Sequence, residues 1–180
     1  MRKLTLASAL AICLLPASTY ADIPEASTGP YIKQYGKAWP VKPDQALPEN
    51  TTFNVAFDAV KSGKPGEVNR SFNSLARFLN MHGKLGVKRE NMKLALVVHG
   101  GATLDLLNDR YFYERSSAKN PNTELLNLLA ENGVEIYICG QSASRHGVEK
   151  HMLNKNVKMA VSAMTAHALL QQKGYTVNPF

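Results

Sequence analysis

The amino-acid sequence predicts an α/β fold, a three-layer sandwich with a mostly parallel five-stranded sheet and helices on both faces. Segments of β-rich and helical periodicity alternate along residues 51–180, which we expect to form one domain. The segment at 92–98 is almost continuously apolar, as in a parallel strand covered on both faces. The spacing of the segments suits right-handed crossovers between parallel strands.

The first half of this domain contains two expected strands separated by a helix. Residues 52–58 alternate and are β-rich, which predicts a strand, and a second strand is expected at 92–98. Between them a helix is expected to end at Gly83. A short helix at 103–107 and an irregular polar loop as far as Pro121 should follow. The helix face consists of apolar residues that recur at steps of three and four: Val68, Phe72, Leu75, Ala76 and Leu79.

The second half repeats the alternation and ends in a strand. Glycines stand where helices are expected to stop, and small polar residues stand where they are expected to start. The expected elements are a helix begun by Asn122 or Thr123 and ended by Gly133, a strand at 134–138, a short helix to about Leu153, a strand at 157–161, a helix at 164–173 capped by Ser162, and a strand at 175–177.

The amino terminus has the organisation of a secretory signal peptide at residues 1–21. Arg2 and Lys3 precede about 12 apolar residues, fewer than the roughly 20 that span a bilayer. Small residues at −3 and −1 place the cleavage site after Ala21. We therefore expect a periplasmic or secreted protein of 159 residues. An uncleaved anchor is disfavoured by the short apolar stretch, and a lipoprotein linked through Cys13 is disfavoured by the bulky residue before it.

Residues 22–50 form a Pro-rich amino-terminal extension without helical or strand periodicity. Its aromatic residues are Tyr31, Tyr35 and Trp39. Such side chains indicate that the segment lies on a surface, either of its own domain or of a neighbouring subunit, and the two are equally expected.

Charge excludes one class of partner. Loss of Arg2 and Lys3 lowers the formal charge from +7 to about +5, and the remaining basic residues are scattered among acidic ones. Because no basic block with interleaved aromatics is present, nucleic-acid binding is disfavoured, although an anion or an acidic partner stays open. No later apolar run is long enough for an integral membrane segment after cleavage.

Three expected strands end in small or polar residues that would meet at one edge of the sheet. These ends are His99-Gly100-Gly101, Cys139-Gly140-Gln141-Ser142 and Ser162. Ligands bind outside the carboxyl ends of strands in open parallel sheets, and glycines let the backbone approach a ligand. Free N–H groups of the following helix starts would lower the pKa of a thiol there. We therefore predict a site in which Cys139 is the reactive residue and the others bind substrate.

Cys139 is the only cysteine left once Cys13 is removed, so the mature chain cannot form an internal disulfide. The thiol is either reactive or a small buried apolar group. His99 either orients a substrate or holds the thiolate as imidazolium, or is a structural donor.

The remaining histidines give no sign of a metal site. His146 and His151 are expected to be exposed, and His167 at the surface or at an interface. Their spacing with a Cys or a carboxylate is not that of metal ligands. The nucleotide-binding and serine-hydrolase motifs are also missing. We therefore expect neither a metal nor a cofactor.

Three segments resemble the DsrE/DsrF-like (TusD-like) sulfur-relay family. Residues 138–148 are similar to its cysteine segment, residues 96–102 to its second-strand turn, and residues 157–164 to its fourth strand and turn. The resemblance implies an α/β sandwich assembled as a trimer or hexamer. It also implies that the cysteine matched by Cys139 carries a persulfide between a sulfur donor protein and an acceptor protein. The export signal and the extension depart from the family pattern.

These observations favour a periplasmic sulfur carrier, or sulfurtransferase-like protein, that holds a persulfide on Cys139. The alternative is a non-catalytic oligomeric module that binds a small ligand or a partner, with Cys139 merely packed in place. A redox-sensing thiol is a third hypothesis.

Overall fold

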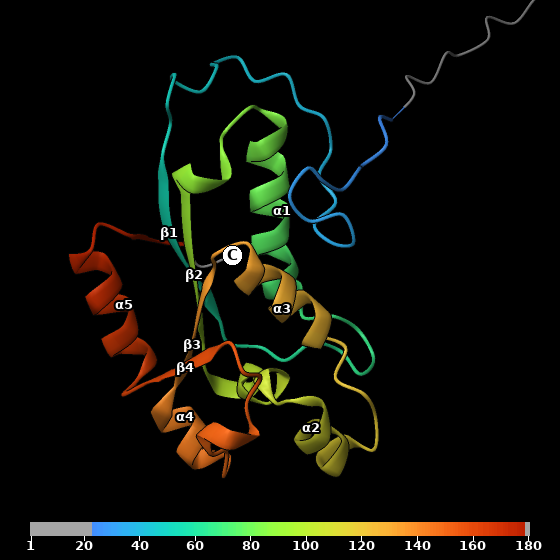
Figure 1. Ribbon diagram of the computed structural model, residues 1–180, viewed down its shortest axis with the longest axis vertical. Helices are drawn as coiled ribbons and strands as arrows, with labels where there is room; N and C mark the ends of the chain where they lie inside the picture. Colours follow the sequence, from blue (N-terminus) through green and yellow to red (C-terminus); the bar gives the residue numbers. More distant parts are fainter. Residues whose placement is uncertain (1–22, 179–180) are drawn as a thin grey trace, which may run out of the picture.

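Five parallel strands form one sheet in the order β4-β3-β2-β1-β5 (Figure 1). The computed structural model describes residues 23–178, so the expected signal peptide at 1–21 lies outside the described residues. Every pair of neighbouring strands is parallel, which confirms the predicted five-stranded sheet. The strands are β1 (Phe53–Ala59), β2 (Met92–Val98), β3 (Glu135–Cys139), β4 (Val157–Ala160) and β5 (Thr176–Asn178).

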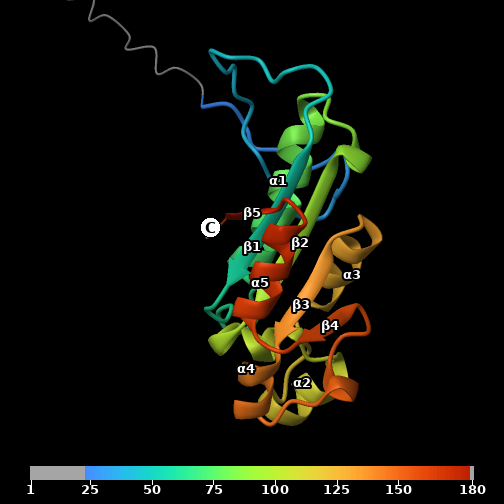
Figure 2. The ribbon, with the colours of Figure 1, turned by 90° about the vertical axis from the view of Figure 1, so that its left-hand side faces the viewer.

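Helices cover both faces of this sheet and complete the predicted three layers. Helices α1 and α3 lie on one face and α5 on the other, as the two views show (Figure 1, Figure 2). No helix among residues 23–178 has the length and apolar character needed to cross a bilayer. The α-helices are α1 (Arg70–Lys84), α2 (Asp109–Ser116), α3 (Thr123–Glu131), α4 (Gly140–Arg145) and α5 (Ala163–Gln172), and the 3₁₀ helices are η1 (Arg89–Asn91), η2 (Gly100–Leu106) and η3 (Lys150–Met152).

The two faces of the sheet bury side chains of different size. Successive residues of a strand point to opposite faces, so the sheet has one large and one small apolar core. The large core, under α1 and α3, contains bulky side chains such as Phe57, Phe72 and Leu96. The small core, under α5, consists of Ala56, Ala95, Val97, Cys139, Ala163, Ala166 and Leu170. Cys139 therefore faces α5.

Helix α2 replaces much of the polar loop that the sequence predicts. The Asn108 side chain begins it by accepting a hydrogen bond from the Tyr111 N–H at 3.2 Å, and Asp109 lies in its first turn, where a negative charge is favourable. None of its residues is buried, so the apolar periodicity that reveals a helix is absent. The expectation of an irregular loop here was wrong for this reason.

Helix α1 does not end at Gly83 but continues to Lys84, with Gly86 in the left-handed region at φ +86°. Gly83 instead lies where the extension crosses the helix. A Cβ there would collide with the Tyr31 ring, so this glycine serves close packing rather than helix termination.

The extension lies along α1 of its own domain (Figure 1). It folds back on itself through an antiparallel bridge between Ser27 and Ala38, and Ile32 is buried at 1% exposure. The side chain of Asn80, on α1, makes five hydrogen bonds of 2.8–3.2 Å to extension backbone groups. Of the three aromatic residues, Tyr31 and Tyr35 pack against the large core, whereas Trp39 is 56% exposed.

Candidate functional site

Cys139 and His99 stand at the same level on neighbouring strands. The register pairs Val98 of β2 with Ile138 of β3, so the next residues, His99 and Cys139, lie side by side where both strands end. Both side chains lie on the α5 face, because Cys139 belongs to the small core and His99 follows Val97 by two residues. The structure therefore brings together two of the residues that the sequence predicts for a site.

The Cys139 thiol is a free, nearly buried group at the N-cap of α4, with 5% of the residue exposed. The Cys139 side chain makes no capping hydrogen bond to α4. Burial has the largest single effect and raises the pKa of the thiol. Four hydrogen-bond donors lower it, and together they outweigh burial: the Ser142 amide, the Ser142 hydroxyl and the amides of Ala163 and Gln141. The pKa of Cys139 is thus lowered from its ordinary value, which favours the nucleophilic thiolate.

Ser142 connects the two strand ends. The Gly100 N–H donates a hydrogen bond of 3.1 Å to the Ser142 oxygen. The Ser142 O–H remains available to donate to the sulfur of Cys139, where it lowers the pKa of the thiol. The turn after β2 is therefore hydrogen-bonded to the residue of the turn after β3 that contacts the thiol.

We expect the Ser142→Ala variant to react several-fold more slowly at neutral pH, since loss of the hydroxyl raises the pKa of Cys139 and lowers its thiolate fraction. The backbone donors remain, so the effect is partial. The measurement is the rate of alkylation against pH, whose midpoint should move upward. The control is Ser144→Ala, an exposed serine of the same helix, and an equal shift in both variants would contradict this role of Ser142.

The predicted glycines allow close approach of the strand ends. At Gly140 a Cβ would lie 2.6 Å from the Ala160 carbonyl oxygen, so only glycine lets β3 enter α4 beside β4. Gly100 adopts φ +57°, and Gly101 accepts a hydrogen bond of 2.6 Å from the Ser62 hydroxyl. These residues shape the turns, and Gly100 reaches the thiol through Ser142.

Ser162 and Gln141 occupy supporting positions. Ser162 caps α5 as expected, because its hydroxyl oxygen accepts the Thr165 N–H at 3.0 Å. It thereby fixes the first turn of α5, whose Ala163 amide acts on the sulfur. Gln141 is exposed, and its contact with the thiol comes from its backbone.

Two residues that the sequence does not single out complete this edge of the sheet. Asp58, next to the last residue of β1, contacts His99 at 3.1 Å and His167 at 2.8 Å. The His167 side chain, which the sequence places at the surface or at an interface, is 16% exposed and reaches from α5 to β1. Asp58 follows Ala56 by two residues, so the alternation of β1 places both side chains on the α5 face. Nothing in the sequence pairs it with a residue 109 positions away.

Chemistry other than that of the thiol finds little support. Among residues 23–178, no three His, Cys, Asp or Glu side chains are grouped so that they could hold a metal ion. His151 is exposed, as expected, and contacts Glu149 at 3.4 Å. His146 is partly buried at the end of α4.

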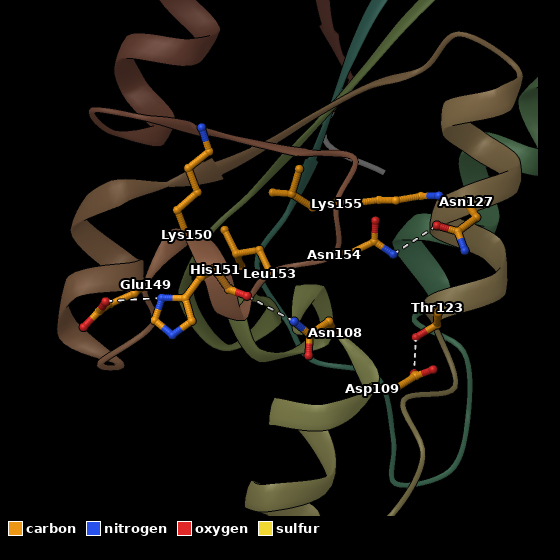
Figure 3. Close-up of a pocket in the computed structure, with 11 residues that line it drawn as sticks. Asn108, Asp109, Thr123, Asn127, Glu149, Lys150, His151, Leu153, Asn154 and Lys155 are labelled. Atoms are coloured by element: carbon orange, nitrogen blue, oxygen red, sulfur yellow. Dashed lines mark hydrogen bonds and ion pairs between the residues drawn. The ribbon is translucent and has the colours of Figure 1, made fainter.

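A hollow of about 890 Å³ lies between α2, α3 and η3, and none of the predicted site residues lines it (Figure 3). Its wall is held by hydrogen bonds between side chains and backbone, such as Asn154 to Asn127 at 3.1 Å and Asn108 to the His151 carbonyl at 3.2 Å. It is open, most of its lining residues are polar, and none of them is a cysteine. We therefore place the candidate site at Cys139.

Comparisons with known proteins agree with this architecture. A sequence model of the DsrE/DsrF-like family matches residues 54–179. The protein of unknown function MTH1491 from Methanobacterium thermoautotrophicum is similar in structure, with a TM-score of 0.55 at 15% identity, over 71% of this chain and 99% of that protein. The ychN protein from E. coli gives 0.52 at 17% identity, over 72% and 100%. No curated protein matches the sequence. At these identities, the two structures support the fold alone.

Proposed function

We propose that this chain, which belongs to the DsrE/DsrF-like family, is a periplasmic sulfur carrier that holds a persulfide on Cys139. One observation carries the proposal: hydrogen-bond donors lower the pKa of a nearly buried thiol at the mouth of a parallel sheet. The thiolate is the form that attacks sulfur, and the same donors would stabilise a persulfide anion. Export through residues 1–21 is part of the proposal.

The carrier step moves one sulfur atom without net oxidation. The Cys139 thiolate attacks the outer sulfur of a donor R–S–SH, and a new S–S bond forms at Sγ. The S–S bond of the donor breaks, and its electron pair leaves with the inner sulfur as R–S⁻. The product is Cys139–S–SH, which an acceptor thiolate attacks in the same way.

The test is the intact mass of the protein after incubation with thiosulfate, polysulfide or the hydropersulfide of a small thiol. We expect the wild type to gain one sulfur atom, and a reductant such as dithiothreitol to remove it. The Cys139→Ser variant, an isosteric control, should gain none. If no donor adds sulfur to the wild type, the carrier function is wrong.

The burial of the thiol favours one alternative, a binding module in which Cys139 is only packed. Alkylation separates the two functions. A carrier thiol reacts quickly in the native protein, whereas a packed thiol reacts slowly until the protein is denatured.

Homo-oligomerisation, as a trimer or hexamer, is part of the proposal. Val161 and Met164, beside the Cys139 turn, are 71% and 80% exposed. Exposed apolar side chains next to a reactive group favour a covering protein, whether another copy of the chain or a donor or acceptor of sulfur.

A further inference from the structure

The carboxylate of Asp58 holds two imidazoles at the edge of the sheet that bears Cys139. Its oxygens lie 3.1 and 3.2 Å from Nε2 of His99, and one lies 2.8 Å from Nε2 of His167. An ionised carboxylate only accepts hydrogen bonds, so each imidazole presents Nε2–H to it. Nδ1 of each ring is then the nitrogen that is left for another group.

The two imidazoles differ in access. Nδ1 of His167 is buried and has no hydrogen-bond partner within residues 23–178. The His99 side chain is 31% exposed, twice the 16% of His167. Of the two, His99 is therefore the one whose free nitrogen can meet a substrate.

Two features bring His99 to the edge of the sheet that bears Cys139. The β2–β3 register makes it the neighbour of Cys139, on strands about 4.8 Å apart. Helix α5 gives the second: its Ala163 amide acts on the sulfur, and His167, one turn or about 6 Å farther along, contacts Asp58. The charged or titratable groups that face His99 are Asp58 from β1, His167 from α5 and Cys139 from β3.

We propose that His99 is the acid–base residue of sulfur transfer at Cys139 and that Asp58 is its positioning residue, an inference that rests on the proposed carrier function. His99 Nδ1 takes the proton of the Cys139 thiol as Sγ attacks the outer sulfur of R–S–SH. The same proton then passes to the leaving R–S⁻. The balance is Cys139–SH plus R–SSH giving Cys139–SSH plus R–SH, with no oxidant or reductant consumed.

The test is the single-turnover rate of sulfur transfer from a small-thiol hydropersulfide, followed against pH. We expect His99→Gln to lower the rate about 100-fold and to remove one ionisation from the profile, and Asp58→Asn to lower it about 10-fold. The control is His151→Gln, which removes an exposed imidazole outside this edge of the sheet and should stay within about 2-fold of the wild type. Added imidazole should restore part of the rate of His99→Gln, a rescue that a structural role would not show.

The outcomes separate this inference from the carrier function. If the wild type and His99→Gln gain sulfur with the same rate and pH profile, the acid–base role is wrong and the carrier stands. If slowing of His99→Gln comes without a changed profile and without imidazole rescue, the role is also wrong. If the wild type gains no sulfur, the carrier function itself fails.

Discussion

The Asn80→Ala variant is expected to lose about 2–4 kcal/mol of unfolding free energy and to release the amino-terminal extension. Asn80 is fully buried on α1, and its amide accepts from two backbone N–H groups of the extension and donates to three carbonyls. Removal of the amide leaves these groups unpaired, at about 1–3 kcal/mol for each that stays buried. Detachment of the segment limits the loss, because water then satisfies the backbone.

Chemical denaturation measures the loss, and limited proteolysis within residues 23–50 reports the release. The matched control is Asn73→Ala, which removes a single 2.9 Å bond from the Gly36 N–H to the same helix, and it should cost about 1 kcal/mol. Equal losses in the two variants, or an extension that resists protease in Asn80→Ala, would contradict this role of Asn80 in holding the extension.

Local signals explain why most of the fold is predictable from the sequence. Strand β2 was placed without error because both of its faces are buried, which leaves a nearly continuous apolar run. Helix α5 was placed because Ser162 caps it and Gly174, at φ +82°, follows it. Helix α2 is not predicted from the sequence because it has no buried apolar face. The Asn108 cap is its one strong signal, and a cap alone does not reveal a helix.

The candidate site was predictable only in part, for a topological reason. The carboxyl ends of parallel strands lie at one edge of a sheet, so the sequence can predict that Cys139, His99 and Gly100 lie close together. The roles of Asp58 and His167 depend on where α5 docks, and the alanines of the small core decide that position. A histidine in the middle of a helix gives no sign of a partner 109 residues earlier.

Both the fold and the candidate site depend on the absence of a Cβ at Gly140. Replacement of this glycine is the second variant for which we expect a large effect. We expect Gly140→Ala to lose about 1–3 kcal/mol of unfolding free energy. Alanine is the better helix former by about 1 kcal/mol, so a loss reports the collision rather than the helix. The collision is with backbone, since a Cβ would lie 2.6 Å from the Ala160 oxygen and 3.1 Å from that of Val161.

Relief of that collision has to move the first turn of α4 away from β4, because Ala160 is level with Cys139 in the sheet. The amides of Gln141 and Ser142 would move with the turn, so the pKa of the thiol should rise and alkylation at neutral pH should slow. Unfolding and alkylation against pH measure the two effects. Gln141→Ala, which changes an exposed side chain of the same turn and keeps its amide, should change neither. If Gly140→Ala is destabilised yet keeps the alkylation profile of the wild type, the amides of α4 are not what lowers the pKa of Cys139.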